Sequence, residues 1–441
     1  ALNTTSQNIA NSQTDGYTRQ GTLLSAVGPA AGGGDAGNGV TVTSLIRFSD
    51  DYKNQQLWRS NSDLGARTQT QPYLTQMEQV LGDDKSGISA GVDQFFAALN
   101  AAGVDPTSTP LRQQVITAAN AMSQHFNSVY NVTTTQVLSV NQQRSAAIPQ
   151  INQITASVAA LNQQIVAANA TGSNSSALVD QRDGQIDKLA SLVGIEVTNQ
   201  NDGSRSVSLT AGQPLVDGNL AATMTLNNTV GGSPTLHLTF GKSGFQVDDT
   251  QVGGQLGGLS NYLKGTLLPL QQSISDLAGQ LSAKVNTQFA AGFDSAGNPG
   301  QALLQFNPAS ASGLLQVVPG LTSSQLAFSG DGTPGDTTNL QALIGIDKQN
   351  VTLTSIGTVL IGDADTQLVG KLGIDSQQNH ALLGTATTIR QQAEDDWKST
   401  SGVNSDEEAI NLVAYQNMYQ ANMKVIAVAN TLFDATLQMF G

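Results

Sequence analysis

The residues that most often carry enzymatic chemistry are few in this sequence and are not grouped. The chain has no cysteine, which excludes thiolate nucleophiles, disulfides, zinc–thiolate sites and iron–sulfur clusters. Its three histidines, His125, His237 and His380, are far apart, and none has a second histidine or a glutamate at the spacing of a metal site. Packing or surface roles are therefore the better interpretation of all three, and we predict no histidine-centred active site.

Carboxylate-rich and glycine-rich patterns also have simpler explanations than chemistry. The segments 331–336 and 363–365 distantly resemble calcium loops, but they lack a glycine at the sixth position followed by a bidentate glutamate, so turn formation explains them better. The glycines within 32–34 and 253–258 lack the spacing of phosphate-binding loops and indicate linkers. The acidic residues at 406–408 would point in different directions on a helix, where they favour the dipole of its first turn. We therefore predict no catalytic residue, no cofactor and no metal site.

The composition excludes further classes of function. The 441 residues carry 19 basic and 33 acidic side chains, a formal charge of −14, so a basic surface for nucleic acid is not expected. Hydrophobic residues make up 39% of the chain and aromatic residues only 5%, which indicates aliphatic cores of the kind found between helices. No apolar run is long enough for a membrane span, and the first twenty residues lack the pattern of a signal peptide.

Apolar residues recur every three or four positions over long stretches, which predicts long helices. The clearest stretch, residues 137–168, follows a heptad pattern and would form a helix of about 48 Å at 1.5 Å per residue, as in a rod. Pro149 is expected to kink it, because proline removes one donor from the helical hydrogen-bond ladder. Further helices are predicted over residues 48–81, 111–129, 178–193, 259–289 and 382–397.

Two regions interrupt this helical pattern. Short alternating runs separated by Asp-Gly and Gly-Gly turns predict a small β unit within 195–247, closed by the glycines of 253–258. Residues 293–362 are rich in Gly, Pro, Ser and Thr, which indicates a second β and irregular region. The predicted fold class is α+β: an elongated, coiled-coil-like bundle of long helices forming a rod domain, with small β-rich domains inserted into it.

The predicted domains follow from these changes of pattern. They are an N-terminal helical end with an extended segment (1–47), a helical rod domain (48–194), an inserted β subdomain (195–255), a helix that returns to the rod (256–292), a second inserted β-rich outer domain (293–362), a further helical part of the rod (363–405) and a C-terminal assembly helix (406–441).

The last helix is unusual because it carries two apolar seams. One contains Leu412, Tyr415, Tyr419, Ile426, Ala429 and Phe433, and the other contains Val425, Val428, Leu432, Ala435 and Met439. A helix with so wide an apolar face needs partners, either elsewhere in the chain or on neighbouring chains.

Several motifs resemble those of one known family. Near the N-terminus stand Asn8-Ile-Ala-Asn11 and Asp15-Gly-Tyr-Thr-Arg-Gln20; further on come Leu178-Val-Asp-Gln-Arg-Asp183, Gly257-Gly-Leu259, Asn286-Thr-Gln288, Ser401-Gly-Val-Asn404, Asp406-Glu-Glu408 and Phe433-Asp-Ala435. Together they resemble the axial proteins of the bacterial flagellum, which form its rod, hook and junctions, and the Tyr-Thr-Arg-Gln ending is similar to that of the hook–filament junction proteins. The stretch 299–362 departs from the family pattern. The resemblance also implies that Ala1 corresponds to a point inside the family's first helix.

The resemblance implies a structural function rather than an enzymatic one. It implies secretion through a flagellar type III export apparatus to the extracellular flagellum, and self-association there. The implied partners are hook protein on one side, a second junction protein (hook-associated protein 3) on the other, and an export chaperone that covers the C-terminal helix beforehand. Terminal helices that order on assembly would bury both seams between subunits. An alternative class, a secreted fibrous adhesin or a phage-tail-like fibre, also combines long helices with glycine-rich β modules.

The predicted assembly interface combines the N-terminal motif with the apolar C-terminal helix. It consists of Asn8, Ile9, Asn11, Gly16, Tyr17, Arg19, Leu412, Tyr415, Tyr419, Asn422, Ile426, Ala429 and Phe433.

Overall fold

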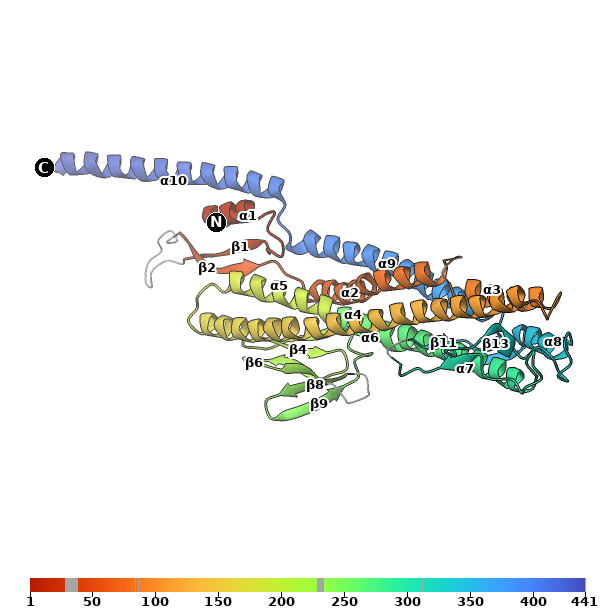
Figure 1. The fold of residues 1–441 in the computed structure, drawn as a ribbon. Helices are drawn as coiled ribbons and strands as arrows, with labels where there is room; N and C mark the ends of the chain where they lie inside the picture. The colour runs from red at the N-terminus through yellow and green to blue at the C-terminus, as the bar shows by residue number, and fades with distance from the viewer. Residues whose placement is uncertain (28–38, 84, 86, 228–233, 311–312, 441) are drawn as a thin grey trace. The chain divides into compact units, whose positions relative to one another are not determined.

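The computed structural model combines long helices with several small antiparallel sheets (Figure 1). It describes residues 1–27, 39–83, 85, 87–227, 234–310 and 313–440, so the predicted glycine linker at 32–34 lies outside the described residues. The chain divides into two compact units, one formed by 1–64, 148–254 and 386–441 and the other by 65–147 and 255–385. The predicted α+β class, long helices with small β regions, is confirmed.

Three long helices carry residues of both units: α2 (Asp51–Leu81), α4 (Thr109–Ala170) and α9 (Ala364–Ser401). The helix predicted over 48–81 is present as α2. The stripes predicted over 111–129 and 137–168 belong to one helix of 62 residues, α4, which contains Pro149 and continues past it.

The apolar pattern of α4 fails between these two stripes because polar side chains occupy its inner face there. Thr133 is fully buried and donates from its hydroxyl to the carbonyl of Tyr130 at 2.7 Å. Gln136 is also buried and donates from Nε2 to the carbonyl of Tyr73 at 3.1 Å. Since both groups have hydrogen-bond partners, they can be buried without a large cost, and the helix continues where hydrophobicity alone predicted a gap.

The first unit contains both ends of the described chain. It begins with α1 (Leu2–Ala10) and the hairpin β1 (Gln20–Ala26) and β2 (Val40–Arg47), and it includes α5 (Ser176–Leu192) and the final helix α10 (Ser405–Phe440). The strands predicted within 195–247 form two antiparallel sheets. The first has the order β3 (Ile195–Asn199), β4 (Arg205–Leu209), β5 (Pro214–Asp217), β6 (Leu220–Ala221), and the second has the order β7 (Thr223–Asn227), β8 (Thr235–Phe240), β9 (Ser243–Val247).

The second unit has one large aliphatic core. Its remaining helices are α3 (Ile88–Ala102), α6 (Gly254–Tyr262), a π-helical turn (Leu263–Leu267), α7 (Leu268–Ala290) and α8 (Thr338–Ile344). Two short antiparallel ribbons lie in the region predicted as β and irregular: β10 (Leu304–Phe306) with β11 (Leu315–Val317), and β12 (Asn350–Leu353) with β13 (Gly357–Leu360). Short 3-10 helices occur at Ser323–Gln325 and Gly345–Lys348.

One local prediction was wrong. The glycines of 253–258 were expected to form a linker, but Gly254 begins α6, and Gly257 and Gly258 lie inside that helix. A Cβ atom on Gly258 would lie 2.5 Å from the carbonyl oxygen of Ala66 in α2. Glycine is therefore needed there because two helix backbones come too close for any side chain.

Candidate assembly site at the terminal segments

The N-terminal motif folds into a turn that fixes α1 to the start of β1. Asn8 is 1% exposed, and its Oδ1 accepts hydrogen bonds from the hydroxyl of Tyr17 at 2.9 Å and from the amide of Gln20 at 3.1 Å. Its Nδ2 donates to the carbonyl of Gln20 at 2.9 Å. Gly16 has φ of +75°, the left-handed conformation that glycine adopts without strain. A side chain that both donates and accepts is required at position 8, because it forms hydrogen bonds with both the amide and the carbonyl of Gln20 at the start of β1.

The other predicted N-terminal residues have smaller roles in this turn. Asn11 follows the last residue of α1 and donates from Nδ2 to the carbonyl of Gln7 at 2.9 Å, so it closes the end of that helix. Ile9 is half-buried. Burial raises the pKa of the Tyr17 hydroxyl, and the charges of Asp180 and Glu408 raise it further, so this hydroxyl stays protonated as a donor to Asn8.

Arg19 links this turn to the beginning of α10. Its Nε lies 2.8 Å from Oε1 of Glu408, and its NH1 lies 3.1 Å from Oε2 of Glu407. Its backbone amide also donates to the carbonyl of Ser401, the last residue of α9, at 2.8 Å. The side chain of Glu408 is only 3% exposed, so Arg19 supplies the positive charge that this buried carboxylate needs. Glu407 and Glu408 were predicted only to favour the helix dipole, and sequence spacing gave no sign of this pairing across 389 residues.

A network of charged side chains contacts the hairpin and the N-terminal turn that precedes it. Arg47, at the end of β2, contacts Asp180 at 2.7 Å and Asp183 at 3.1 Å, both on α5. Asp183 also contacts NH1 of Arg205, on β4, at 2.5 Å. Oδ2 of Asp180 accepts a hydrogen bond from the amide of Thr18 at 3.3 Å. The motif Leu178–Asp183 thus connects the hairpin, α5 and the first small sheet, a role that sequence reasoning did not assign to it.

Burial sets the electrostatics of this network. It raises the pKa of Asp180, an effect that the charge of Arg47 partly offsets. Arg182, which is 2% exposed, has its pKa lowered to about 10 by burial, and it donates from NH1 to the carbonyl of Gly203 at 2.7 Å. Each buried cation thus has a carboxylate or carbonyl partner, so the network positions elements and leaves no carboxylate in an open cleft for proton transfer.

The structure brings only the first turns of α10 to this site. α1 packs against α10 (Figure 1), where Leu412 and Tyr415 are half-buried. The more distal predicted residues are exposed: Tyr419, Asn422, Ile426, Ala429 and Phe433. The predicted site residues therefore fall into two groups, a folded turn against the base of α10 and an open face along the rest of that helix.

The exposed face of α10 is large and apolar. Twelve of its hydrophobic side chains are between 48% and 83% exposed: Ile410, Val413, Met418, Tyr419, Met423, Val425, Ile426, Val428, Leu432, Phe433, Leu437 and Met439. An exposed apolar surface of this extent usually marks a site of protein–protein contact. From Tyr419 onward, both predicted seams thus lie open in the isolated chain.

The described residues contain little else that could act chemically. Among them, no group of three or more His, Asp or Glu side chains is arranged to hold a metal ion. His125, His237 and His380 lie on α4, β8 and α9 respectively. None of the helices in the described ranges is both long and apolar enough to cross a bilayer.

Comparisons with known proteins identify relatives along the whole chain. The family model described as flagellar hook-associated protein FlgK helical domain matches residues 74–304, and the model described as flagellar basal body rod FlgEFG protein C-terminal matches residues 399–439. Flagellar hook-associated protein 1 of Bacillus subtilis is 25% identical over all of this chain and 95% of its own length. The protein of the same name from Escherichia coli is 25% identical over all of this chain and 97% of its own length.

One solved structure has a similar fold. The flagellar hook junction protein FlgK from Burkholderia pseudomallei superimposes with a TM-score of 0.66. It covers 78% of this chain and 100% of its own length, at 17% sequence identity.

Proposed function

The chain belongs to the flagellar hook-associated protein FlgK family, and from this premise we propose that it connects hook and filament by burying its terminal helices between subunits. It is a structural subunit of the bacterial flagellum at the hook–filament junction. The observation that carries the proposed mechanism is the apolar face of α10, which no described part of the chain covers beyond its first turns. We retain the predicted domain boundaries, with a C-terminal assembly helix from residue 406, as part of this proposal.

The size of this face sets how α10 assembles. Complete burial of a Leu, Ile, Val, Met or Phe side chain contributes about 1.5–3 kcal/mol, so burying the roughly half that remains exposed contributes about 1 kcal/mol each. Eleven such side chains, together with Tyr419, give a gross gain of order 10 kcal/mol, which is similar to the cost of about 4–15 kcal/mol for associating two proteins. Pairwise association would therefore be weak. An array, in which each helix contacts several neighbours that are already ordered, is the arrangement that stabilises assembly.

The base of α10 sets the direction in which the helix leaves the folded unit. Arg19, Glu407 and Glu408 hold the first turn, and Asn8 holds α1 beside it. The proposed interface therefore has a rigid base and an open apolar face. Asn8, Ile9, Asn11, Gly16, Tyr17 and Arg19 act by positioning α1 and α10, while Tyr419, Asn422, Ile426, Ala429 and Phe433 contact neighbouring subunits. Leu412 and Tyr415 lie between these groups.

The partners follow from a place between hook and filament. We propose hook protein on one side, hook-associated protein 3 on the other, and an export chaperone that covers α10 before assembly. The match of residues 399–439 to the C-terminal segment of basal body rod proteins supports this, because the helix is then of a type that other flagellar components also carry. Secretion to the extracellular flagellum and the lack of catalytic activity belong to the same proposal. None of the relatives named above is an adhesin or a tail fibre, so that alternative gains no support.

Immunogold electron microscopy of cells tests the proposed location. An epitope inserted at the exposed Gly241–Lys242 turn between β8 and β9 would stand outside the terminal segments, in a strain lacking the native copy. We expect gold particles at the point where hook meets filament. Labelling along the whole filament, or on the cell body alone, would refute the proposed place in the flagellum.

A further inference from the structure

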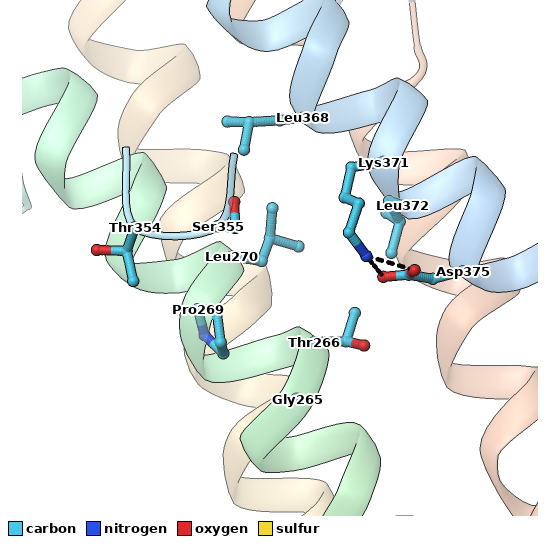
Figure 2. A pocket seen from close by; sticks show the side chains of 10 residues that line it. All are labelled: Gly265, Thr266, Pro269, Leu270, Thr354, Ser355, Leu368, Lys371, Leu372 and Asp375. Carbon is cyan, nitrogen blue, oxygen red and sulfur yellow. Dashed lines mark hydrogen bonds and ion pairs between the residues drawn. The ribbon is translucent and has the colours of Figure 1, made fainter. Parts of the chain in front are cut away.

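The second unit contains a pocket whose lining residues have no role in the assembly proposed above (Figure 2). Its volume is about 240 Å³, and it lies between the π-helical turn with the start of α7, the turn between β12 and β13, and α9. The lining residues are Gly265, Thr266, Pro269, Leu270, Thr354, Ser355, Leu368, Lys371, Leu372 and Asp375. Gly265, Thr354 and Lys371 are exposed, so the pocket can be reached from solvent.

The wall formed by the π-helical turn has an unusual backbone conformation and contains a glycine. π-Helical turns are rare and occur frequently at functional sites. Gly265 lies in the middle of this turn, and a glycine within a helix costs about 0.5–1 kcal/mol relative to alanine. A Cβ atom on Gly265 would meet no atom within 4 Å, so no neighbour excludes a side chain there. The glycine therefore does not relieve a clash, and its lack of a side chain leaves the edge of the pocket that it lines uncovered.

The pocket has an apolar floor and a polar end. Leu270, Leu368 and Leu372 form the floor and are at most 4% exposed. At the polar end, the ammonium of Lys371 donates to the carboxylate of Asp375 (Figure 2). An ammonium has three donors and a carboxylate about four acceptor sites, so this pair can still accept one hydrogen bond and donate another.

The turn between β12 and β13 forms another wall of the pocket and is tied to α7 by two hydrogen bonds (Figure 2). The hydroxyl of Thr354 donates to Asp276 at 2.7 Å, and the amide of Ser355 donates to the hydroxyl of Ser273 at 2.8 Å. Both anchors lie on α7, the helix that also supplies Leu270. Since two hydrogen bonds join this turn to α7, these two walls of the pocket are preformed, as the walls of ligand sites usually are.

We propose that this pocket binds an aliphatic side chain of a partner polypeptide together with the peptide group next to it. The volume is below the roughly 300–1,000 Å³ of pockets for drug-sized ligands, so one side chain is the group that fits. The leucine floor selects an aliphatic body. The adjacent ammonium and carboxylate carry no net charge and offer a donor beside an acceptor, which matches the C=O and N–H of a neutral peptide group. This inference does not depend on the flagellar function proposed above.

Methyl NMR of the full chain tests the proposal with N-acetyl-leucinamide as the probe. We expect saturable shifts of the leucine methyl signals of Leu270, Leu368 and Leu372. N-acetylglycinamide, which keeps the peptide groups but lacks the side chain, should bind at least about tenfold more weakly. Lys371→Met, which keeps the aliphatic stem and removes the ammonium, should also weaken binding of the leucine probe severalfold.

Two matched glycine substitutions identify the site. Gly265→Met adds a long side chain at the edge of the pocket without a clash at its Cβ, so it should keep or raise the melting temperature and weaken binding at least about tenfold. Gly384→Met is the control, because Gly384 is an exposed glycine of α9 outside the pocket whose Cβ would also meet no atom within 4 Å. Equal binding of both probes, unchanged binding in Gly265→Met, or no saturable shift in the unsubstituted chain would overturn the proposal.

Discussion

Placing two carboxylates on the exposed face of α10 should separate assembly from folding. Ile426 and Phe433 are 54% and 65% exposed, one heptad apart on the same seam. Because both side chains already contact solvent, Ile426→Asp with Phe433→Asp should change the melting temperature of the isolated chain only slightly, as surface substitutions usually do.

The expected effect on assembly follows from the exposed apolar area of Ile426 and Phe433. Losing the burial of these two partly exposed side chains removes about 2–3 kcal/mol from each subunit contact. Burying two unpaired carboxylates in a dry interface adds a cost of several kcal/mol. At about 1.4 kcal/mol per factor of ten, the affinity for the growing structure should fall by at least about 10³-fold.

Motility assays and secretion assays measure the two sides of this prediction. In cells lacking the native copy, the double variant should be exported normally but should restore no swimming, and filament subunits should be lost to the medium. The control is Gln420→Asp with Thr431→Asp, which adds the same charge at exposed polar positions of the same helix. Normal swimming with the double variant would refute the reasoning, and so would a large fall in its melting temperature as an isolated chain.

Three further predictions concern the folded base and one exposed loop. Arg19→Gln leaves the buried carboxylate of Glu408 without its cation, so amide hydrogen exchange in the first turns of α10 should quicken, reflecting a loss of about 1–3 kcal/mol. Asp183→Asn removes the shared carboxylate partner of three arginines, and the melting transition should reveal a loss of about 3–5 kcal/mol. Hydrogen bonds from Thr338 and from the amide of Gly330 lower the pKa of Asp336 to about 2. The lowered value means that this stabilisation is complete above the unfolded pKa of about 4 and is lost between pH 4 and pH 2. NMR signals of that loop should therefore broaden or shift in this window, and an unchanged loop at pH 2 would contradict the assignment.

The sequence predicted the helices and their apolar faces well, because burial in a helix repeats every three to four residues. It failed where another kind of contact decided the structure. Thr133 and Gln136 are polar but buried and hydrogen-bonded, so the apolar pattern did not predict that α4 is continuous. Gly258 was predicted to belong to a linker, whereas it allows two helix backbones to approach closely. These features depend on partners that lie far away in the sequence, so periodicity cannot reveal them.

Only part of the candidate assembly site could likewise be predicted from the sequence. The open face of α10 was predictable, because two apolar seams on one helix are visible in the sequence alone. The pairing of Arg19 with Glu408 and the network around Asp183 were not, because each joins elements more than 20 residues apart. Charged residues of this kind carry no periodic signal, and their roles emerge only when the fold brings opposite charges together.

Cysteine labelling in the assembled flagellum tests the central claim most directly. The chain contains no cysteine, so Ile426→Cys introduces a single reactive thiol on the exposed face of α10, and Lys242→Cys introduces one on the exposed β8–β9 turn. In the purified chain, a maleimide should label both positions quickly. In isolated flagella, position 242 should remain reactive, whereas position 426 should be protected, since neighbouring helices would cover it. Equal labelling of position 426 in the purified chain and in the flagellum would contradict the account, because α10 would then not be buried on assembly.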